Sequence, residues 1–581
     1  MSKNLLSILK IIPIFTPMIS SNKKGVQILV EQCIAHGMKH IVFSPGSRNA
    51  PFIIAFDEHP DVKCIVIHDE RSAAFYAMGM AQQLNEPVGI ICTSGSALLN
   101  YYPAIAEAYY QAIPLVAITA DRPSEWVDQG DGQTIVQHDV FKNHIRYSCT
   151  LTEKADDSDA VWYLEREIST AFNHGNGNWK GPIHINMSFN EPLYGTTEIE
   201  PLKGKVIQSM SSFFQLNSSQ EIELKNTWEN SPKKMIICGQ LPIDKALLEQ
   251  LKQLSDDTSV VVLVENTSNQ VHQSFIHCID RTLNAISESE LEDFSPDLLI
   301  TFGGAVVSKR IKSYLRKYKA KNHWKVGFDF PYMDTYQALT HTFECSPLSF
   351  SSLLNSFSSP RNVSSFGSKW KQKDFMVQDQ LPAFYDEIPY SDLKVFETIL
   401  DYIPEMSHLH MANSSVVRYC QLFDPVASIN YWSNRGTSGI DGSTSTAFGA
   451  ASVDSTTWNT LITGDVSFFY DSNAFWNNHL GANIRVFMIN NGGGGIFKII
   501  PGPHSTNQLT DYFVAEHSFS AEYICKAFKV DYFKANSIEE IESQMESFFG
   551  YEENGRPKLM EIFTPTDVNP TILETFFEKM K

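Results

Sequence analysis

Two polar motifs, each directly after a short apolar run, constrain the fold of this chain more than any other feature. Residues 459–463 are followed by Gly464-Asp465, and residues 483–489 are followed by Asn490-Asn491 and then by four glycines. Runs of this length and composition predict buried strands, and residues 470–480 leave room for one crossover helix. The strands would form a βαβ unit whose ends lie side by side at the edge where open α/β sheets bind ligands.

The groups at these two strand ends suit a divalent cation and a diphosphate. The carboxylate of Asp465, the amide oxygen of Asn491 and the backbone carbonyl of Gly493 are hard oxygen donors, which Mg²⁺ binds in near-octahedral geometry. Glycines at 492–495 permit positive φ and let backbone amides approach phosphate oxygens. The alternative is an ordinary surface turn, because Asn-Gly sequences are common in turns.

The spacing between the two motifs resembles the fingerprint of the thiamine-diphosphate-dependent enzymes, which include 2-oxoacid decarboxylases, synthases and transketolases. The resemblance implies that Asp465, Asn491 and the carbonyl of Gly493 hold Mg²⁺ or Mn²⁺. The metal would anchor the diphosphate of the cofactor.

Composition predicts a large cytoplasmic enzyme. A chain of 581 residues with 43% hydrophobic residues is long enough for about three or four domains. The nine cysteines are scattered and never spaced as Cys-x-x-Cys, so neither a disulfide framework nor a zinc site is expected. A net charge of −20 argues against nucleic acid or an anionic membrane as partner, because such surfaces require clustered Lys and Arg.

No segment predicts a membrane span. The apolar start of the chain, residues 5–19, is interrupted by Lys10, Pro13 and Pro17 and has no convincing cleavage site. We expect an extension or a first helix there.

Apolar runs alternate with helical patterns along the chain, which predicts an α/β fold with parallel sheets. We expect three α/β domains, at 1–190, 233–345 and 392–581, joined by linkers at 191–232 and 346–391. The expected strands include 40–44, 64–68, 88–92, 114–118, 183–186, 234–238, 260–263 and 298–301. This plan resembles the pyrimidine-binding, central and diphosphate-binding domains of the thiamine-diphosphate decarboxylase group over nearly the whole chain. The resemblance implies a cofactor shared across a homodimer, or a dimer of dimers.

An acidic triplet, Asp69-Glu70-Arg71, stands between the predicted strand 64–68 and a predicted helix at 72–83. The resemblance implies that Glu70 is the acid that faces the aminopyrimidine ring of the cofactor, where a proton shift drives the amino group to its imino form. Without the resemblance, an acidic residue at a helix start more often stabilises the helix dipole.

Arginines recur where predicted strands pass into loops. Four strings share this placement, at residues 44–49, 119–123, 413–418 and 433–442, and Lys309-Arg310 follows another strand. Guanidinium groups capture carboxylates through two parallel hydrogen bonds, so a substrate with several carboxylates is expected. Exposed arginines that are simply solvated are the alternative.

Together these strings resemble the 2-succinyl-5-enolpyruvyl-6-hydroxy-3-cyclohexene-1-carboxylate synthase family of menaquinone biosynthesis. The resemblance implies decarboxylation of 2-oxoglutarate and addition of the succinyl unit to isochorismate. The residues implied to hold the carboxylates of the 2-oxoglutarate part are Ser414, Arg418 and Arg435. Those implied to face isochorismate are Ser47, Arg48, Arg122, Gln133 and Lys309, with Arg310 as a further charge.

Apolar residues near the motifs complete the implied site. Ile440 would be the wedge that bends the cofactor, and the pocket walls would be Ile496, Phe497 and Ile500. Apolar residues at such spacing are otherwise core residues. Two positions depart from the family, Gly132 where relatives often have Asn, and Gly495 in place of a larger residue. We expect both departures to affect substrate affinity.

Other thiamine-diphosphate enzymes are less consistent with the sequence. None of the 17 histidines is followed by another, whereas pyruvate-type decarboxylases usually carry an adjacent pair. The central segment has no Gly-x-Gly-x-x-Gly for the flavin of an acetohydroxyacid synthase. Two alternatives remain: another thiamine-diphosphate 2-oxoacid decarboxylase or carboligase, and a non-catalytic member of the fold.

Overall fold

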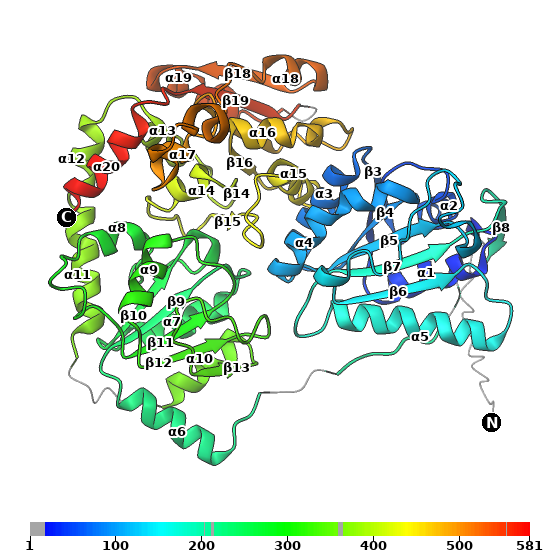
Figure 1. Ribbon diagram of the computed structural model, residues 1–581, viewed down its shortest axis with the longest axis horizontal. Helices are drawn as coiled ribbons and strands as arrows, with labels where there is room; N and C mark the ends of the chain where they lie inside the picture. Colours follow the sequence, from blue (N-terminus) through cyan, green and yellow to red (C-terminus); the bar gives the residue numbers. More distant parts are fainter. Residues whose placement is uncertain (1–17, 201, 203, 211–213, 358–363, 553–554) are drawn as a thin grey trace, which may run out of the picture.

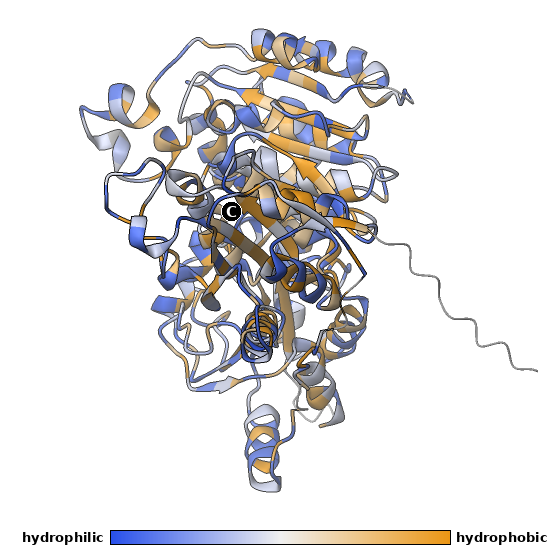
Figure 2. Cartoon of the chain, turned by 90° about the vertical axis from the view of Figure 1, so that its right-hand side faces the viewer, coloured by the Kyte–Doolittle hydropathy of each residue, from blue (hydrophilic) through white to orange (hydrophobic). Residues whose placement is uncertain are grey.

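The computed structural model describes residues 18–200, 202, 204–210, 214–357, 364–552 and 555–581. Its architecture is three parallel α/β sheets, and the predicted fold class is confirmed. Figure 1 shows the first sheet in blue and cyan, the middle sheet in green, and the third sheet in yellow to red. Figure 2 shows that the strands are mainly hydrophobic, while the outer helices alternate hydrophilic and hydrophobic positions.

The first sheet is built from strands that are apolar on both faces, because helices cover both sides of a parallel sheet. Its strands are β2 (His40–Phe43), β3 (Lys63–Val66), β4 (Val88–Cys92), β5 (Leu115–Asp121), β6 (Tyr147–Thr152) and β7 (Ile183–Ser188). Its helices are α1 (Lys24–Ala35), α2 (Ala50–Asp57), α3 (Glu70–Leu84), α4 (Tyr102–Gln111) and α5 (Ser158–Gly175). The spatial order of the strands is β3-β2-β4-β5-β7-β6.

The middle sheet has the order β10-β9-β11-β12-β13. Its strands are β9 (Lys234–Cys238), β10 (Val260–Val264), β11 (Leu298–Phe302), β12 (Asn322–Val326) and β13 (His341–Phe343). The helices of this region are α6 (Ser218–Glu229), α7 (Lys245–Ser255), α8 (Ile279–Asn284), α9 (Lys309–Lys317), α10 (Pro347–Ser356), α11 (Phe366–Gln378) and α12 (Leu381–Glu387). The two segments expected to be linkers therefore contain more structure than a linker. Helix α10 packs Phe350 and Leu354 into the core of the middle sheet. Our division into domains stays a prediction.

The third sheet has strands β14 (His408–Met411), β15 (Asn430–Trp432), β16 (Asn459–Gly464), β17 (Ile484–Asn490), β18 (Asp531–Ala535) and β19 (Lys558–Phe563). Its helices are α13 (Asp392–Asp401), α14 (Ser415–Cys420), α15 (Ser443–Val453), α16 (Asp465–Tyr470), α17 (Ile496–Ile499), α18 (Glu522–Phe528), α19 (Ile538–Phe549) and α20 (Asn569–Lys579). The order is β15-β14-β16-β17-β19-β18.

Every strand that the sequence predicted is present. The ends differ most for the run 64–68, where β3 already ends at Val66, and for the run 114–118, where β5 continues to Asp121. The crossover helix expected at 470–480 is wrong. The crossover instead starts with α16, directly after β16, and continues as a short 3₁₀ turn, η5 (Ser472–Phe475).

Helices α3 and α15 join the first domain to the third. Each helix follows the second strand of its own sheet, and the two helices pack face to face with their backbones close together. A Cβ on Gly79 of α3 would lie 2.0 Å from the carbonyl oxygen of Thr446, and one on Gly449 of α15 would lie 1.8 Å from that of Tyr76. Glycine at both positions is what permits this approach.

The start of the described chain is a strand. β1 (Met18–Ser21) pairs antiparallel with β8 (Thr196–Ile199). The predicted extension or helix at 5–19 lies outside the described residues, apart from Met18 and Ile19, which belong to β1. In the part of the chain that the structure describes, no helix has the length and apolar character needed to cross a bilayer.

Candidate active site

A carboxylate and the glycine turn after β17 form the most closely linked part of the site. Strands β16 and β17 pair Gly464 with Ile489, so the residues that follow them meet at one edge of the sheet. Asp465 is only 2% exposed, and its Oδ2 accepts hydrogen bonds from the backbone N–H groups of Gly492 and Gly493, each at 2.9 Å. These glycines have φ values of 79° and 145°. The turn therefore wraps around the carboxylate of Asp465.

Asn491 is oriented by a hydrogen bond to a second buried carboxylate. Its Nδ2 donates to Oδ2 of Asp392, at the start of α13, at 3.0 Å. Since the amide nitrogen points at that carboxylate, the amide oxygen of Asn491 is left to coordinate a cation. Gly495 makes room for this amide, because a Cβ there would lie 3.0 Å from Nδ2 of Asn491. The glycine that departs from the family pattern thus packs against the Asn491 amide.

The donors at this edge fit a divalent cation. Burial raises the pKa of Asp465 to about 6, although its backbone hydrogen bonds oppose the shift. Any positive charge that approaches would stabilise such a carboxylate. Asp465, the amide oxygen of Asn491 and the carbonyl of Gly493 are hard donors of the kind that Mg²⁺ and Mn²⁺ prefer. The described residues contain no cluster of three His, Cys, Asp or Glu side chains placed to hold a metal, so a cation here would use amide and carbonyl oxygens beside one carboxylate.

His517 is a neighbour of Asp465 that the sequence did not reveal. Its Nε2 lies 3.4 Å from Oδ2 of Asp465, and its backbone N–H donates to the carbonyl oxygen of Gly492 at 3.0 Å. It lies far downstream of both motifs and in no recognisable pattern, so only the fold brings it to the site.

Glu70 is the first residue of α3, at the carboxyl edge of the first sheet. The cap of this helix is Asp69, whose Oδ1 accepts from the backbone N–H groups of Arg71 at 2.9 Å and Ser72 at 3.2 Å. Glu70 therefore does not act as the cap. It is half-buried, and burial, aided by the nearby Asp69, raises the pKa of Glu70. Such an environment favours a carboxyl group that holds a proton.

The residues on either side of Glu70 are tied to the third domain of the same chain. Nη2 of Arg71 donates to the carbonyl oxygen of Tyr470 at 2.7 Å, and Nδ2 of Asn473 donates to Oδ2 of Asp69 at 2.7 Å. Tyr470 ends the helix α16, which begins at Asp465. The start of α3 and the helix that begins at Asp465 are thus held together.

Arg48 and Arg122 lie close together at the carboxyl edge of the first sheet. Arg48 is buried, donates to the carbonyl oxygen of Phe189 at 3.2 Å and pairs with Glu191 at 3.1 Å. Burial, and then the charge of Arg122, lower the pKa of Arg48. Arg122 pairs with Asp131 at 3.0 Å. Both predicted cations therefore already have carboxylate partners.

Ser47 and Gln133 are exposed at the same edge. Gln133 has a φ of 55°, and its backbone packs on Gly95, where a Cβ would lie 3.0 Å from the Cα of Gln133. Gly132 contributes its carbonyl oxygen, which accepts from Nη2 of Arg122 at 3.2 Å. Gly132 therefore contacts Arg122 through its backbone alone.

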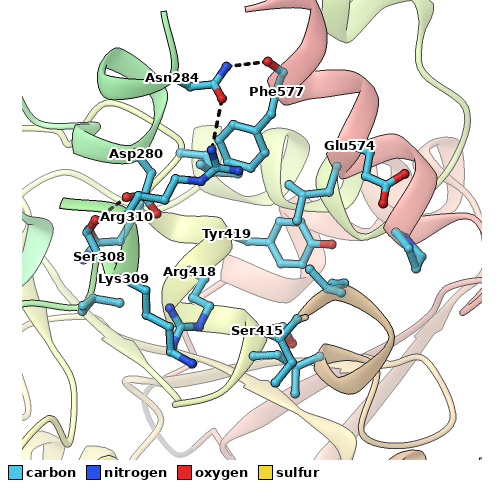
Figure 3. Close-up of a pocket in the computed structure, with 18 of the residues that line it drawn as sticks. Asp280, Asn284, Ser308, Lys309, Arg310, Ser415, Arg418, Tyr419, Glu574 and Phe577 are labelled. Atoms are coloured by element: carbon cyan, nitrogen blue, oxygen red, sulfur yellow. Dashed lines mark hydrogen bonds between the residues drawn. The ribbon is translucent and has the colours of Figure 1, made fainter. Parts of the chain in front are cut away.

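A second group of cations lines a cavity of about 700 Å³ between the middle and third domains. The cavity brings together five predicted site residues, Lys309, Arg310, Arg418, Ile496 and Ile500. Figure 3 shows Lys309 and Arg418 side by side, the first from α9 and the second from α14. Residues that the sequence did not indicate complete the lining, among them Asp280, Asn284, Ser415, Tyr419, Glu574 and Phe577.

Arg310 is held at the wall of this cavity. Its Nη1 donates to Oδ1 of Asn284 at 3.1 Å, and its guanidinium lies 3.9 Å from the centre of the Phe577 ring, as Figure 3 shows. Lys309 and Arg418 are the less constrained cations of the cavity wall.

Arg435 lies at the end of β15, in the loop of the third domain that is directed toward the other two domains. It is 7% exposed, and its Nη1 donates to Oδ1 of Asn413 at 2.6 Å. Burial lowers the pKa of Arg435, Glu265 opposes the shift, and the charge of Arg418 adds to it. Arg418 and Arg435 therefore share one positively charged region.

Ser414 and Ile440 flank this region. Ser414 has a φ of 71°, which a non-glycine residue seldom adopts, and such strain concentrates at functional sites. Nδ2 of Asn413 donates to the carbonyl oxygen of Gly439 at 2.6 Å, and Ser467 of α16 donates to that of Ile440 at 2.7 Å. Ile440 is thereby held between Asn413 and the helix that starts at Asp465. Phe497 packs on Phe513, with 5.6 Å between ring centres.

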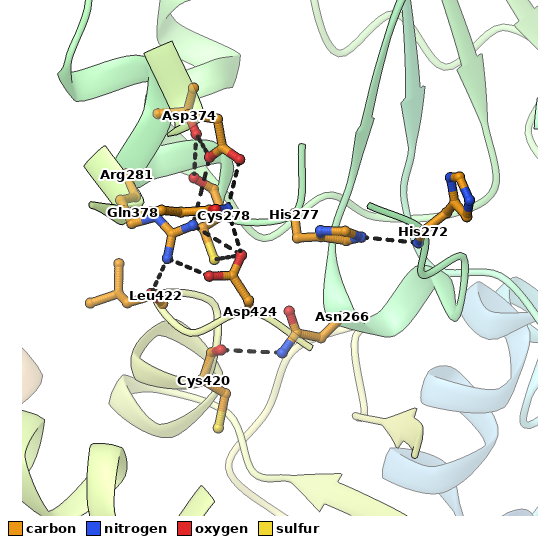
Figure 4. Close-up of polar contacts among 11 residues, drawn as sticks. Asn266, His272, His277, Cys278, Arg281, Asp374, Gln378, Cys420, Leu422 and Asp424 are labelled. Atoms are coloured by element: carbon orange, nitrogen blue, oxygen red, sulfur yellow. Dashed lines mark hydrogen bonds and ion pairs between the residues drawn. The ribbon is translucent and has the colours of Figure 1, made fainter. Parts of the chain in front are cut away.

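An ion pair between a buried arginine and an exposed aspartate anchors the wall of the cavity that α8 forms. Arg281, with no exposed surface, makes two hydrogen bonds of 2.9 Å to the carboxylate of Asp424 in the third domain, as Figure 4 shows. Asp374 of α11 lies 3.6 Å from the same guanidinium. The neighbouring Asp280 accepts a hydrogen bond from Ser308, which precedes α9. The pair thus fixes the middle domain against the third.

Known proteins match this chain over most of its length. Residues 23–143 match the N-terminal TPP binding domain of thiamine pyrophosphate enzymes, and residues 203–410 match the middle domain of thiamine pyrophosphate enzymes. The 2-succinyl-5-enolpyruvyl-6-hydroxy-3-cyclohexene-1-carboxylate synthase of Flavobacterium johnsoniae is 43% identical, over 95% of this chain and 98% of its own. The enzymes of that name from Christiangramia forsetii and Porphyromonas gingivalis are 45% identical, over 95% and 98%, and 41% identical, over 96% and 97%.

The chain belongs to the 2-succinyl-5-enolpyruvyl-6-hydroxy-3-cyclohexene-1-carboxylate synthase family. The predicted family is confirmed, and with it the class, a thiamine-diphosphate-dependent enzyme. Among the candidate residues of this synthase family member, Arg48, Glu70 and Arg122 lie within the N-terminal match and Lys309 within the middle match. The residues around Asp465 lie in the part that the full-length relatives cover.

In this member of the synthase family, the sites that the sequence predicted fall into separate places within one chain. We call the group of Asp465, Asn491 and the carbonyl of Gly493 the clamp. The clamp and the cavity of Lys309 and Arg418 are connected, because α17 follows the glycine turn directly and lines the cavity with Ile496. Arg48 and Arg122 stand apart, at the edge of the first sheet. Buried acids such as Asp392, Glu107 and Glu265 belong to no motif.

Proposed function

We propose that this protein decarboxylates 2-oxoglutarate and adds the succinyl unit to isochorismate, giving 2-succinyl-5-enolpyruvyl-6-hydroxy-3-cyclohexene-1-carboxylate and CO₂ in menaquinone biosynthesis. The observation that carries the proposal is the connection between the clamp and the cationic cavity. Helix α17 leaves the glycine turn at Gly495 and lines the cavity beside Lys309 and Arg418. A substrate that binds its carboxylates in the cavity therefore extends toward the cofactor site.

The cofactor would be held at the carboxyl edge of the third sheet. Asp465, the amide oxygen of Asn491 and the carbonyl of Gly493 would bind Mg²⁺ or Mn²⁺ and, through it, the diphosphate. When bound, thiamine diphosphate supplies a nucleophilic carbon and an electron sink for the loss of CO₂. Ile440, Ile496, Phe497 and Ile500 would form the apolar surroundings that exclude water.

Glu70 would hold and return a proton at its carboxyl group. The raised pKa of Glu70 supports this role, because a general acid works best when its pKa approaches the pH of the reaction. We propose that it acts on the cofactor bound by a second subunit, so that a homodimer, or a dimer of such dimers, is the active form. In the dimer, Arg48 and Arg122 of one subunit would face the cavity of the other.

The cations would bind and orient the two substrates. Ser414, Arg418 and Arg435 would hold the carboxylate of 2-oxoglutarate that does not react. Isochorismate would be bound by Ser47, Arg48, Arg122, Gln133 and Lys309, with Arg310 as a further charge at the wall. Because Arg48 and Arg435 are largely buried, their charges act in surroundings with little water, where electrostatic stabilisation is strongest. Free, unpaired cysteines support a location in the cytoplasm, which we propose.

A direct assay tests the reaction. Purified protein is mixed with Mg²⁺, thiamine diphosphate and 2-oxoglutarate, with and without isochorismate, and both isochorismate absorbance and CO₂ are followed. We expect isochorismate to disappear only when 2-oxoglutarate is present, with equal amounts of CO₂ released. CO₂ release without consumption of isochorismate would favour another decarboxylase of the group. Cofactor binding without any CO₂ would favour a non-catalytic member.

A further inference from the structure

Two buried glutamates that belong to no motif each accept hydrogen bonds from two consecutive backbone N–H groups. Glu265, after β10, is 2% exposed and accepts from Val307 at 2.6 Å and Ser308 at 2.8 Å. Glu107, in α4, is 1% exposed and accepts from the backbone of residues 436 and 437, each at 2.6 Å. One glutamate comes from the middle domain and the other from the first, and both reach into a different segment of the chain.

Both pairs of N–H groups lie next to cationic side chains that we propose to bind substrate. Ser308 caps α9, whose first residue is Lys309, in the lining of the cavity. Gly436 directly follows Arg435, and a Cβ on Gly436 would lie 2.6 Å from the carbonyl oxygen of Glu107. The close approach of α4 to this loop therefore requires glycine there. Each glutamate therefore fixes the backbone next to a residue with a cationic side chain.

Arg435 lies between the two glutamates. The charges of Glu265 and Glu107 both raise the pKa of Arg435, against the effect of burial. Glu265 comes from the middle domain, Glu107 from the first and Arg435 from the third. Arg435 thus interacts electrostatically with acids of both other domains.

We propose that Glu107 and Glu265 are positioning residues, which hold Arg435 and the cations of α9 in a fixed arrangement for one dicarboxylate substrate. The proposal rests on the proposed function, since it assumes that Arg435 binds a carboxylate of 2-oxoglutarate. It adds that Lys309 and Arg310, proposed above for isochorismate, also border 2-oxoglutarate, because they line one cavity with Arg418.

The physical reason is preorganisation. Hydrogen bonds from N–H groups to a carboxylate are stronger than those to neutral acceptors, so each glutamate restrains its loop more than an amide would. Restrained loops spare the substrate the cost of ordering them when it binds. Loss of a glutamate also leaves a buried N–H group without its partner. The cations would then sample arrangements in which they cannot reach the substrate together.

The test compares Glu265→Gln and Glu107→Gln with a matched control. The amide keeps the shape of the side chain but accepts from only one of the two N–H groups. Glu153 is the control, because it is also buried, accepts from the backbone N–H of Asn190 at 3.2 Å and pairs with Lys23. It contacts neither Arg435 nor α9. Its readout is KM for 2-oxoglutarate, because Asn190 adjoins Phe189 and Glu191, the contacts of Arg48. Thermal melting of all three variants is measured to compare their stability.

We expect KM for 2-oxoglutarate to rise about tenfold in Glu265→Gln and Glu107→Gln, while kcat changes less than about threefold. Glu153→Gln should leave KM for 2-oxoglutarate at the wild-type value. Glu265→Asp keeps the charge beside Arg435 but not the reach, and it should bind substrate as poorly as Glu265→Gln. Recovery of the wild-type KM in Glu265→Asp, or an equal rise of KM in Glu153→Gln, would overturn the proposal.

A second measurement separates this proposal from the proposed function. Binding of glutarate, a dicarboxylate that cannot lose CO₂, is measured by calorimetry without thiamine diphosphate. We expect about tenfold weaker binding in Glu265→Gln and Glu107→Gln than in the wild type. If the wild type turns over 2-oxoglutarate and the variants bind glutarate as tightly, the proposal fails and the proposed function stands. If the wild type does not turn over 2-oxoglutarate, the proposed function fails, and the affinities for glutarate still decide the proposal.

Discussion

The first and third sheets have the same strand order, but the residues at their corresponding strand ends differ in charge. In the first sheet the fourth strand, β5, leads into Asp121 and Arg122, whereas in the third sheet the fourth strand, β17, leads into Asn490 and Asn491. The third strand leads into Thr93 in one sheet and into Asp465 in the other. The order of strands thus places both sites at the same edge, and the loops decide their chemistry.

The charges at the two edges are also balanced differently. Arg48 and Arg122 already pair with Glu191 and Asp131. Asp465, by contrast, is a buried carboxylate whose pKa burial raises to about 6. At the edge of the first sheet, a substrate carboxylate would have to compete with Glu191 and Asp131 for the two arginines. At the edge of the third sheet, the carboxylate of Asp465 would be stabilised by a bound cation. Four substitutions test whether this difference decides the roles of the two edges.

The largest effect is expected at the edge of the third sheet. Asp465→Ala removes the single carboxylate of the clamp, so metal and diphosphate lose their anchor, and turnover should fall by about 10³-fold or more. Binding of thiamine diphosphate as a function of Mg²⁺, followed by fluorescence, should be lost as well. Asp401→Ala, at the exposed end of α13, is the control and should bind the cofactor normally. Normal Mg²⁺-dependent binding by Asp465→Ala would show that the clamp lies elsewhere.

The next largest effect is expected at Glu70, the acid of the first sheet. Glu70→Gln removes the proton-carrying group and should lower kcat by about 10²- to 10⁴-fold. Exposed Glu86→Gln serves as the control. Undiminished turnover in Glu70→Gln would remove Glu70 from proton transfer.

The free energy of unfolding of Glu70→Gln, unlike its kcat, should not fall. Because the pKa of Glu70 is raised in the folded protein, its contribution to stability is present below its ordinary pKa of 4.5 and is lost as the pH rises through the raised value. A neutral amide does not suffer this loss. Glu70→Gln should therefore be at least as stable as the wild type at pH 8 in urea unfolding, and a clear loss of stability would point to a structural role instead.

A smaller effect is expected from the cations of the first sheet. Arg122→Ala should raise KM for isochorismate by about 10- to 100-fold and leave KM for 2-oxoglutarate within a few fold, since it removes one charged contact to one substrate. Arg166→Ala, an arginine of α5 that pairs with Glu167, is the control. Equal increases for both substrates would mean that the two edges do not divide the substrates between them.

The smallest effect on activity is expected at the contact that joins the two sheets. Gly449→Ala forces a methyl group against the backbone of Tyr76 in α3, so the free energy of unfolding should fall by about 1–3 kcal/mol. Gly132→Ala, where no atom lies within 4 Å of the new Cβ, should have little effect on stability. Urea unfolding measures both. An unchanged stability of Gly449→Ala would show that the helices can separate without cost.

The fold class and the main elements could be predicted from the sequence, because each buried strand is a local run of apolar residues between turn residues. The proximity of Asp465 and Asn491 could also be predicted, since they follow two neighbouring strands that a single crossover joins. The crossover helix was predicted at the wrong residues, also for a local reason. Asp465 starts α16 directly after β16, where a loop was expected before the helix.

Contacts between segments far apart in the chain could not be predicted in this way. Glu265 and Ser308, Glu107 and Gly436, and His517 and Asp465 come together only through the tertiary fold. In each pair the first residue stands in no pattern that marks it.

The sequence by itself determined the chemistry available at the strand ends of this protein, because strand formation and turn conformation depend on neighbouring residues. Only the tertiary structure decided which of these groups share a cavity, which carboxylates are buried, and which cations already have partners. Burial and charge pairing depend on the whole surroundings of a group, and these exist only once the three sheets are packed.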